Sequence, residues 1–128
     1  MKVHKFIIIG KLPNLNDYIY SNRTNKYAGN KMKKDAQKLA CIYIKKDLKD
    51  LEILKPVFLR YKFYEPNKRR DLDNIASFAH KIIQDSLVST GVLKNDGWKE
   101  IIGFEDTFFI DKDNPRIEIT IEEWRASE

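Results

Sequence analysis

Residues 68–74 read Lys68-Arg69-Arg70-Asp71-Leu72-Asp73-Asn74, and the rest of the sequence is organised around this stretch. An amphipathic run follows it, and a further acidic position, Asp96, comes after that run. Mg²⁺ prefers hard oxygen ligands, usually one or two carboxylates with water and substrate phosphate. In an extended segment residues i and i+2 point the same way, so Asp71 and Asp73 are predicted to face one ion while Leu72 turns inward. The three preceding cations would then receive phosphates.

The same stretch has a simpler interpretation. Asp and Asn are common residues at helix N-caps, and a run of Lys and Arg is common on a solvated surface. A helix cap beside a charged surface therefore stays open as the alternative to a metal site.

The wider pattern around this stretch resembles a known family. Residues 70–74 (R-D-L-D-N), a helix carrying Lys81 and Asp85, and residues 91–96 (G-V-L-K-N-D) are similar to the RusA family of Holliday-junction resolvases. These are small endodeoxyribonucleases found mostly in phages and prophages. Leu12-Pro13 with Asn16 and Tyr18 also resembles the N-terminal segment of that family, so the resemblance extends over nearly the whole chain.

The resemblance implies a mixed α/β homodimer that cuts four-way DNA junctions with Mg²⁺, or with Mn²⁺ in its place. On that basis Asp71, Asp73 and Asp96 correspond to the catalytic, metal-binding aspartates of the family. The family also uses a lysine. Counting forward from the aspartate pair places it at Ser77, whereas counting back from Asp96 places it at Lys81.

We predict Lys81 as the catalytic lysine. The four extra residues amount to about one helical turn, which keeps nearly the same helix face. We expect them to be absorbed at the helix entrance, within residues 74–78, so that Lys81 stays level with the carboxylates. The alternative is a surface ion pair between Lys81 and Asp85.

Bulk composition is that of one domain, spanning residues 1–128. The 128 residues are 42% hydrophobic and 12% aromatic, which is enough for a core. No stretch approaches the ~20 apolar residues of a membrane span, and one cysteine, Cys41, cannot form an internal disulfide framework. These features favour a cytoplasmic protein that does not bind membranes.

Charge is divided unevenly along the chain. Residues 1–70 hold 18 Lys and Arg against 6 Asp and Glu, a net charge of +12, and residues 71–128 hold 6 against 13, a net charge of −7. This division favours a polyanion-binding surface beside a cation-binding one, although uneven charge is also common in proteins without such partners.

The N-terminal half contains further candidate DNA-binding residues. Residues 3–12 are β-branched and apolar and predict a strand, and residues 14–30 are predicted to form a long ordered loop. Residues 31–48 have the period of a helix with lysines on its outer face. The candidates, with the first stretch included, are Asn16, Tyr18, Arg23, Lys33, Lys34, Lys68, Arg69 and Arg70. Packing of the tyrosines on the body and a merely solvated helix face are equally open alternatives.

The second half predicts a strand over residues 57–64, in which Val57, Leu59, Tyr61 and Phe63 share one face. It also predicts a helix from residue 73 or 74 to about 89, and strands over 107–110 and 116–122. Residues 111–115 (D-K-D-N-P) indicate a hairpin turn between the last two strands. The fold class is α+β, a mixed sheet with two main helices in the order β-α-β-α-β-β and helices on one face.

The function that this sequence predicts is Mg²⁺-dependent, structure-selective cleavage of branched DNA by a homodimer. Two alternatives remain at this level: a nucleic-acid-binding protein without catalysis, and a phage protein-interaction module.

Overall fold

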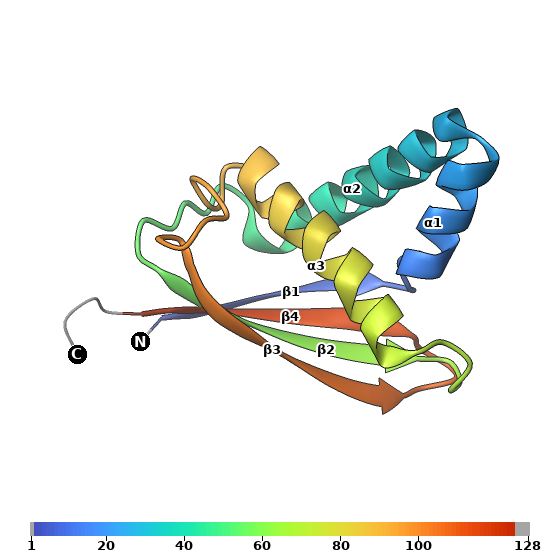
Figure 1. Cartoon of the computed structure of the whole chain (residues 1–128). Helices are drawn as coiled ribbons and strands as arrows, with labels where there is room; N and C mark the ends of the chain where they lie inside the picture. The colour runs from blue at the N-terminus through green and yellow to red at the C-terminus, as the bar shows by residue number, and fades with distance from the viewer. Residues whose placement is uncertain (1, 125–128) are drawn as a thin grey trace.

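The structure, a computed structural model, describes residues 2–124. One four-stranded sheet carries the helices on a single face, as predicted (Figure 1). The elements in chain order are β1 (Val3–Ile9), α1 (Leu15–Thr24), α2 (Lys26–Leu48), β2 (Val57–Glu65), α3 (Leu72–Ser89), β3 (Ile101–Ile110) and β4 (Arg116–Glu123). The predicted α+β class and element order are confirmed, with a third helix, α1, added.

The strand order is β1-β4-β2-β3. β2 is parallel to β3 and antiparallel to β4, and β4 is antiparallel to β1. The predicted hairpin at residues 111–115 is therefore wrong, because β2 lies between β3 and β4. The Asp111 amide instead donates to the Glu65 carbonyl at 2.8 Å, which holds the connection across the end of β2.

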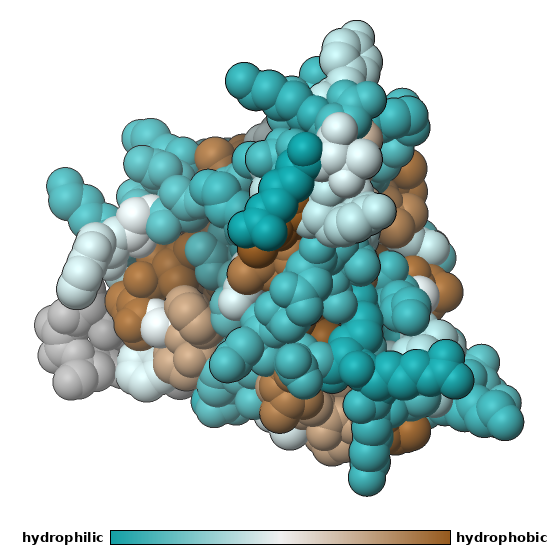
Figure 2. Space-filling view, turned by 45° about the vertical axis from the view of Figure 1, so that its right-hand side comes forward, coloured by the Kyte–Doolittle hydropathy of each residue, from teal (hydrophilic) through white to brown (hydrophobic). Residues whose placement is uncertain are grey.

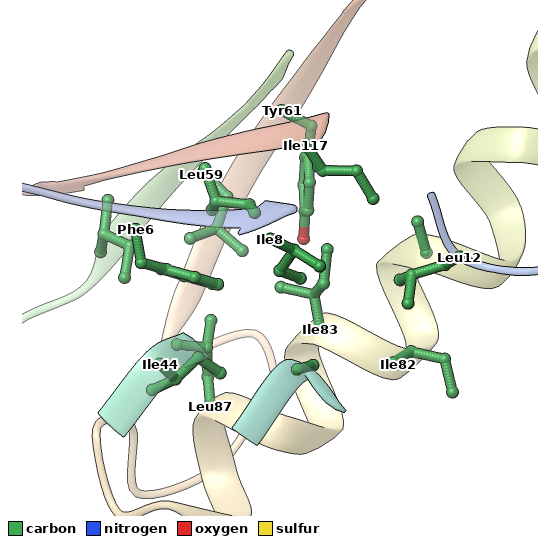
Figure 3. Close-up of a cluster of buried hydrophobic side chains, with 14 of the residues drawn as sticks. Phe6, Ile8, Leu12, Ile44, Leu59, Tyr61, Ile82, Ile83, Leu87 and Ile117 are labelled. Carbon is green, nitrogen blue, oxygen red and sulfur yellow. The ribbon is translucent and has the colours of Figure 1, made fainter. Parts of the chain in front are cut away.

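The core lies between the sheet and the helices (Figure 3). Alternate residues of a strand point to opposite faces, and the four residues of β2 that were predicted to share one face all point into the core. Its four inward residues are all 0% exposed: Val57, Leu59, Tyr61 and Phe63. They meet buried residues of α2 and α3, among them Ile44, Ile83 and Leu87.

Residues 14–30 are helical, so the predicted loop is wrong. Asn14 accepts a hydrogen bond from the Asp17 amide at 2.8 Å, and Asp17 accepts one from the Asn14 amide at 3.1 Å. This capping box begins α1. Asn25 then ends α1 and caps α2. The polar residues that indicated a loop are the caps of two successive helices.

The helix α3 begins earlier than predicted. Asp71 is its N-cap, so Asp73 lies inside the first turn. Leu72 is 55% exposed, which corrects the prediction that it turns inward. The helix runs unbroken from Leu72 to Ser89, so the expected adjustment within residues 74–78 is absent.

The unit β2-α3-β3 sets the geometry of the predicted site. The start of α3 lies beside the end of β3, and the loop that follows α3 lies at the opposite end of the sheet, before β3 begins (Figure 1). Within residues 2–124, no helix combines the length and the apolar character needed to cross a membrane.

Candidate metal and nucleic-acid site

The first candidate site is a cleft of about 480 Å³ at the start of α3. Asp71 and Lys68 line it, and its apolar wall comes from α3 and from the end of β3, with residues Leu72, Ile75, Phe108, Phe109 and Ile110. Asp71 and Asp73 are both exposed. The Asp71 side chain makes no capping hydrogen bond. Its carboxylate oxygens therefore remain available to a cation.

Arg70 lies in the wall of this cleft, where its side chain is largely buried and its guanidinium is held by other parts of the protein. Its guanidinium donates to both carboxylate oxygens of Glu65 at 2.9 Å and to the Leu12 carbonyl at 2.7 Å. The side chains of Arg70 and Glu65 are 13% and 7% exposed. The sequence analysis did not identify Glu65, because an acidic residue at the end of a strand is normally exposed and nothing in the local sequence indicates that this one is buried.

A second arginine organises the same end of the sheet. Arg116 donates to Asp111 at 2.9 Å and to Glu118 at 2.8 Å, and its guanidinium lies 3.8 Å from the centre of the Tyr64 ring. The hydrogen bond from Arg116 holds the pKa of Asp111 below its ordinary value. Burial opposes ionisation of Glu118, but hydrogen bonds from Lys5 and Arg116 outweigh it and lower the pKa of that carboxyl.

Asp96 lies at the other end of the unit. It lines a separate cleft of about 310 Å³ with Gln84 and with residues 101–104 at the start of β3. Asp71 lies beside residues 108–110 at the end of the same strand. A strand of 10 residues is about 33 Å long, so the two aspartates lie at opposite ends of it.

The three aspartates do not form one site within one chain. In the part of the chain that the structure describes, no group of three or more His, Cys, Asp and Glu side chains is placed to hold a metal ion. Over the same residues, no ion pair engages the carboxylates of Asp71, Asp73 or Asp96. The donor set suits Mg²⁺, which takes one or two carboxylates from a given segment, but it is divided between two places.

Lys81 is far from the aspartate pair along α3. It lies eight residues after Asp73, about 12 Å along the helix axis. Its ammonium is 3.3 Å from Asp85, and the lysine side chain is 63% exposed. Ser77, the other candidate position, donates its hydroxyl to the Asp73 carbonyl at 2.6 Å. The surface ion pair that was one interpretation of Lys81 is present.

The remaining DNA-binding candidates divide into two groups. Lys68, Arg69, Asn16, Arg23 and Lys34 are exposed, and Lys33 is half-buried. Tyr18 instead packs on Phe78, with ring centres 5.4 Å apart, which is the packing alternative left open for it. Figure 2 turns the end of the molecule with α1 and the start of α3 toward the viewer and shows a mostly hydrophilic surface there.

The edge of the sheet carries a feature that the sequence did not reveal. β3 is an edge strand, and four of its large apolar residues are between 39% and 49% exposed: Ile102, Phe104, Phe109 and Ile110. Trp98, two residues after Asp96, is 99% exposed. An edge strand presents unpaired backbone donors and acceptors, and proteins normally cover an apolar one.

Comparison with known proteins gives one family. A family model described as "Endodeoxyribonuclease RusA" matches residues 11–122. The match covers most of the chain and includes every candidate residue named above. No curated protein matches the chain significantly.

Proposed function

The chain belongs to the RusA family, whose members are endodeoxyribonucleases that resolve Holliday junctions, and we propose that it holds its divalent metal in sites shared between the two subunits of a homodimer. The protein is a phosphodiester hydrolase that acts on DNA. In the proposed site, Asp71 and Asp73 come from one subunit and Asp96 from the other. The observation that carries this proposal is the position of these residues at opposite ends of β3.

The exposed edge of β3 supports a two-fold arrangement. If two copies of β3 lie antiparallel about a C2 axis, the start of one strand meets the end of the other. The Asp96 end of one subunit then lies beside the Asp71 end of its partner, twice by symmetry. The apolar residues of the edge, with Trp98, would be covered by the same contact.

The chemistry follows from what each side chain provides. A bound Mg²⁺ supplies a Lewis acid for the scissile phosphate and an activated water. The carboxylates of Asp71, Asp73 and Asp96 hold the charge of that ion, and without it three carboxylates in close quarters would repel one another. The first-turn amides of α3 add positive potential at the same point, which favours a phosphate.

Lys81 acts on the DNA rather than beside the metal in this proposal. Its ammonium lies 3.3 Å from Asp85, one turn further from the aspartate pair, so it does not reach the level of the metal ligands. The exposed cations Lys68 and Arg69 bind phosphates near the cleft. Arg23, Lys33 and Lys34, with Asn16, bind the DNA arm that passes α1 and α2. Phosphate contacts of this kind position the duplex without reading its sequence.

Cleavage of a synthetic four-way junction tests the metal site. Asp71→Asn, Asp73→Asn and Asp96→Asn should each abolish Mg²⁺-dependent cutting while junction binding persists, because an amide keeps the shape of the side chain and loses the charge that holds the ion. Normal cutting by one of the three variants would remove that residue from the site. Binding should weaken steeply with salt, because phosphate contacts release counterions.

Paired substitutions on α3 test the lysine. Because Lys81 acts on the DNA in this proposal, Lys81→Ala should weaken junction affinity and reduce the salt slope by about one, as the loss of one phosphate contact does. It should leave thermal stability nearly unchanged because the side chain is exposed. Ser77→Ala, one turn nearer the aspartates, is the matched control and should be nearly silent. Unchanged junction affinity and salt slope in the Lys81→Ala protein would remove Lys81 from the DNA-binding surface.

A further inference from the structure

We infer that the Glu65–Arg70 ion pair is a positioning device for the metal ligand Asp71, and that Arg70 does not bind DNA. The inference rests on the proposed function of Asp71. It departs from the sequence prediction, which placed Arg70 with Lys68 and Arg69 among the phosphate-binding residues.

The pair joins three segments that meet at the cleft. Glu65 ends β2, Leu12 lies in the connection from β1 to α1, and Arg70 immediately precedes the N-cap of α3. The guanidinium bridges both Glu65 oxygens at 2.9 Å and the Leu12 carbonyl at 2.7 Å. Three of its five N–H donors are therefore used within the protein. Few other side chains could make this junction, because a lysine cannot form the planar two-point contact.

Burial separates Arg70 from its neighbours. Its side chain is 13% exposed and that of Glu65 is 7% exposed, whereas Lys68 and Arg69 are exposed. A phosphate contact by any of the engaged donors that hold Glu65 would require Arg70 to leave that carboxylate, which would then keep an uncompensated charge in a buried place, and the two remaining donors belong to a side chain that is only 13% exposed. Breaking such a pair from one side is strongly unfavourable. The neighbouring cations meet a phosphate without any such loss.

The contact fixes the backbone next to Asp71. The Asp71 carboxylate has no capping hydrogen bond of its own, so its direction depends on where the chain enters α3. Arg70 ties that entry to the end of β2 on one side and to Leu12 on the other. Displacement of a reacting group by about 1 Å can cost about 10²-fold in rate, and the loss of a residue that orients a metal ligand typically weakens metal binding 10–100-fold.

The test replaces the pair without leaving a buried charge. A Glu65→Leu/Arg70→Met double variant keeps the volume apolar, a change that proteins often tolerate, but removes the tie to Leu12. Arg69→Met is the matched control for loss of one exposed cation. Four quantities are measured on the full-length protein: the salt dependence of junction affinity without divalent metal, the cutting rate at saturating Mg²⁺, the Mg²⁺ concentration for half-maximal cutting, and Mn²⁺ affinity without DNA by electron paramagnetic resonance.

The double variant should keep the wild-type salt slope, lose roughly 10²-fold in saturated rate, and need about ten times more Mg²⁺, with Mn²⁺ affinity falling in parallel. Arg69→Met should reduce the salt slope by about one. If the double variant had a salt slope reduced by about one, Arg70 would be a phosphate ligand. If the double variant kept the wild-type cutting rate and the wild-type metal affinity, the ion pair would have only a structural role. Either result overturns the inference.

Arg70→Lys keeps the positive charge, and it provides the same test if the double variant does not fold. It should retain the salt slope while rate and Mn²⁺ affinity fall, and wild-type values for both would contradict positioning. Asp71→Asn separates the two proposals. Full activity in that variant would refute the metal site itself, whatever the Arg70 variants do.

Discussion

Two inactive variants, Asp71→Asn and Asp96→Asn, should restore activity when they are combined in one dimer. In a shared site, one of the two sites of the mixed dimer receives both substitutions, and the other receives none. If each site were built from one chain, both sites of the mixed dimer would carry one substitution and neither would work. Co-expression of the variants with two different tags, followed by purification on both tags, yields the mixed dimer alone.

The size of the expected recovery follows from the geometry. The 18 residues of α3 span about 27 Å between Asp71 and the loop that carries Asp96, whereas Mg²⁺ binds its ligands at about 2.1 Å. No side-chain movement within one chain closes that gap. The purified mixed dimer should therefore have about half of the wild-type sites, and an unsorted equal mixture about a quarter, since half of its dimers are mixed.

A plasmid that extrudes a cruciform is the substrate for this assay, because it distinguishes one cut from two. The mixed dimer should convert the supercoiled form to the nicked circle and should not yield the linear product that wild-type protein makes with two sites. Complete inactivity of a correctly folded mixed dimer would refute the shared site. Linear product at the wild-type rate would also refute it, because one intact site cannot make paired cuts.

Two further predictions concern stability. Gly29→Ala should lower the free energy of unfolding, measured by urea denaturation, by about 1–3 kcal/mol, because a Cβ at residue 29 would lie 2.9 Å from the Asn22 Cα on the neighbouring helix. Gly97→Ala is the control and should cost less, because the nearest atom to its Cβ would be the flexible Glu100 carboxylate oxygen at 3.3 Å. Burial raises the pKa of Tyr61 above its ordinary value, so the neutral phenol contributes stability that is fully present below the unfolded-state pKa of about 10 and is lost as pH rises above it. Tyr61→Phe should abolish this alkaline loss in a pH series of urea unfolding, and Tyr64→Phe should retain it.

The sequence predicted the parts of the fold that depend on local pattern. Alternation along residues 57–64 gave the inner face of β2 correctly, because the period of a strand is two and one face of this sheet is buried. The prediction of a loop over residues 14–30 was wrong because local composition is ambiguous there. Asn14 and Asn25 cap helices here, and polar cap residues in close succession have the same composition as a loop. The predicted pairing of the last two strands was also wrong. The hairpin interpretation of residues 111–115 used only the sequence between those strands, which does not reveal that β2 lies between them.

The candidate site could be predicted in kind but not in arrangement. The aspartate pair followed by Asp96 identified the family, and the family model confirms that identification. The burial of Arg70 could not be predicted, because it depends on Glu65 and Leu12, which reach it only through the fold. Lys68, Arg69 and Arg70 are alike in sequence, yet two are exposed and one forms a bidentate pair.

The division of the three aspartates follows from the topology of the fold rather than from the length of α3. Parallel neighbours β2 and β3 are joined by a helix that returns the chain to the starting end of the sheet. A residue after β2 and a residue before β3 must then lie about one strand length apart, however long the helix is. A change in the length of α3 would move neither end of the sheet, so it would leave the proposed meeting of Asp71 with the partner's Asp96 intact, although it would shift Lys81 relative to Asp73. With Asp71, Asp73 and Asp96 as the proposed ligands, a subunit with this connection does not complete the metal site by itself. In the proposed dimer, cutting therefore depends on the same two-fold assembly that matches the symmetry of a four-way junction.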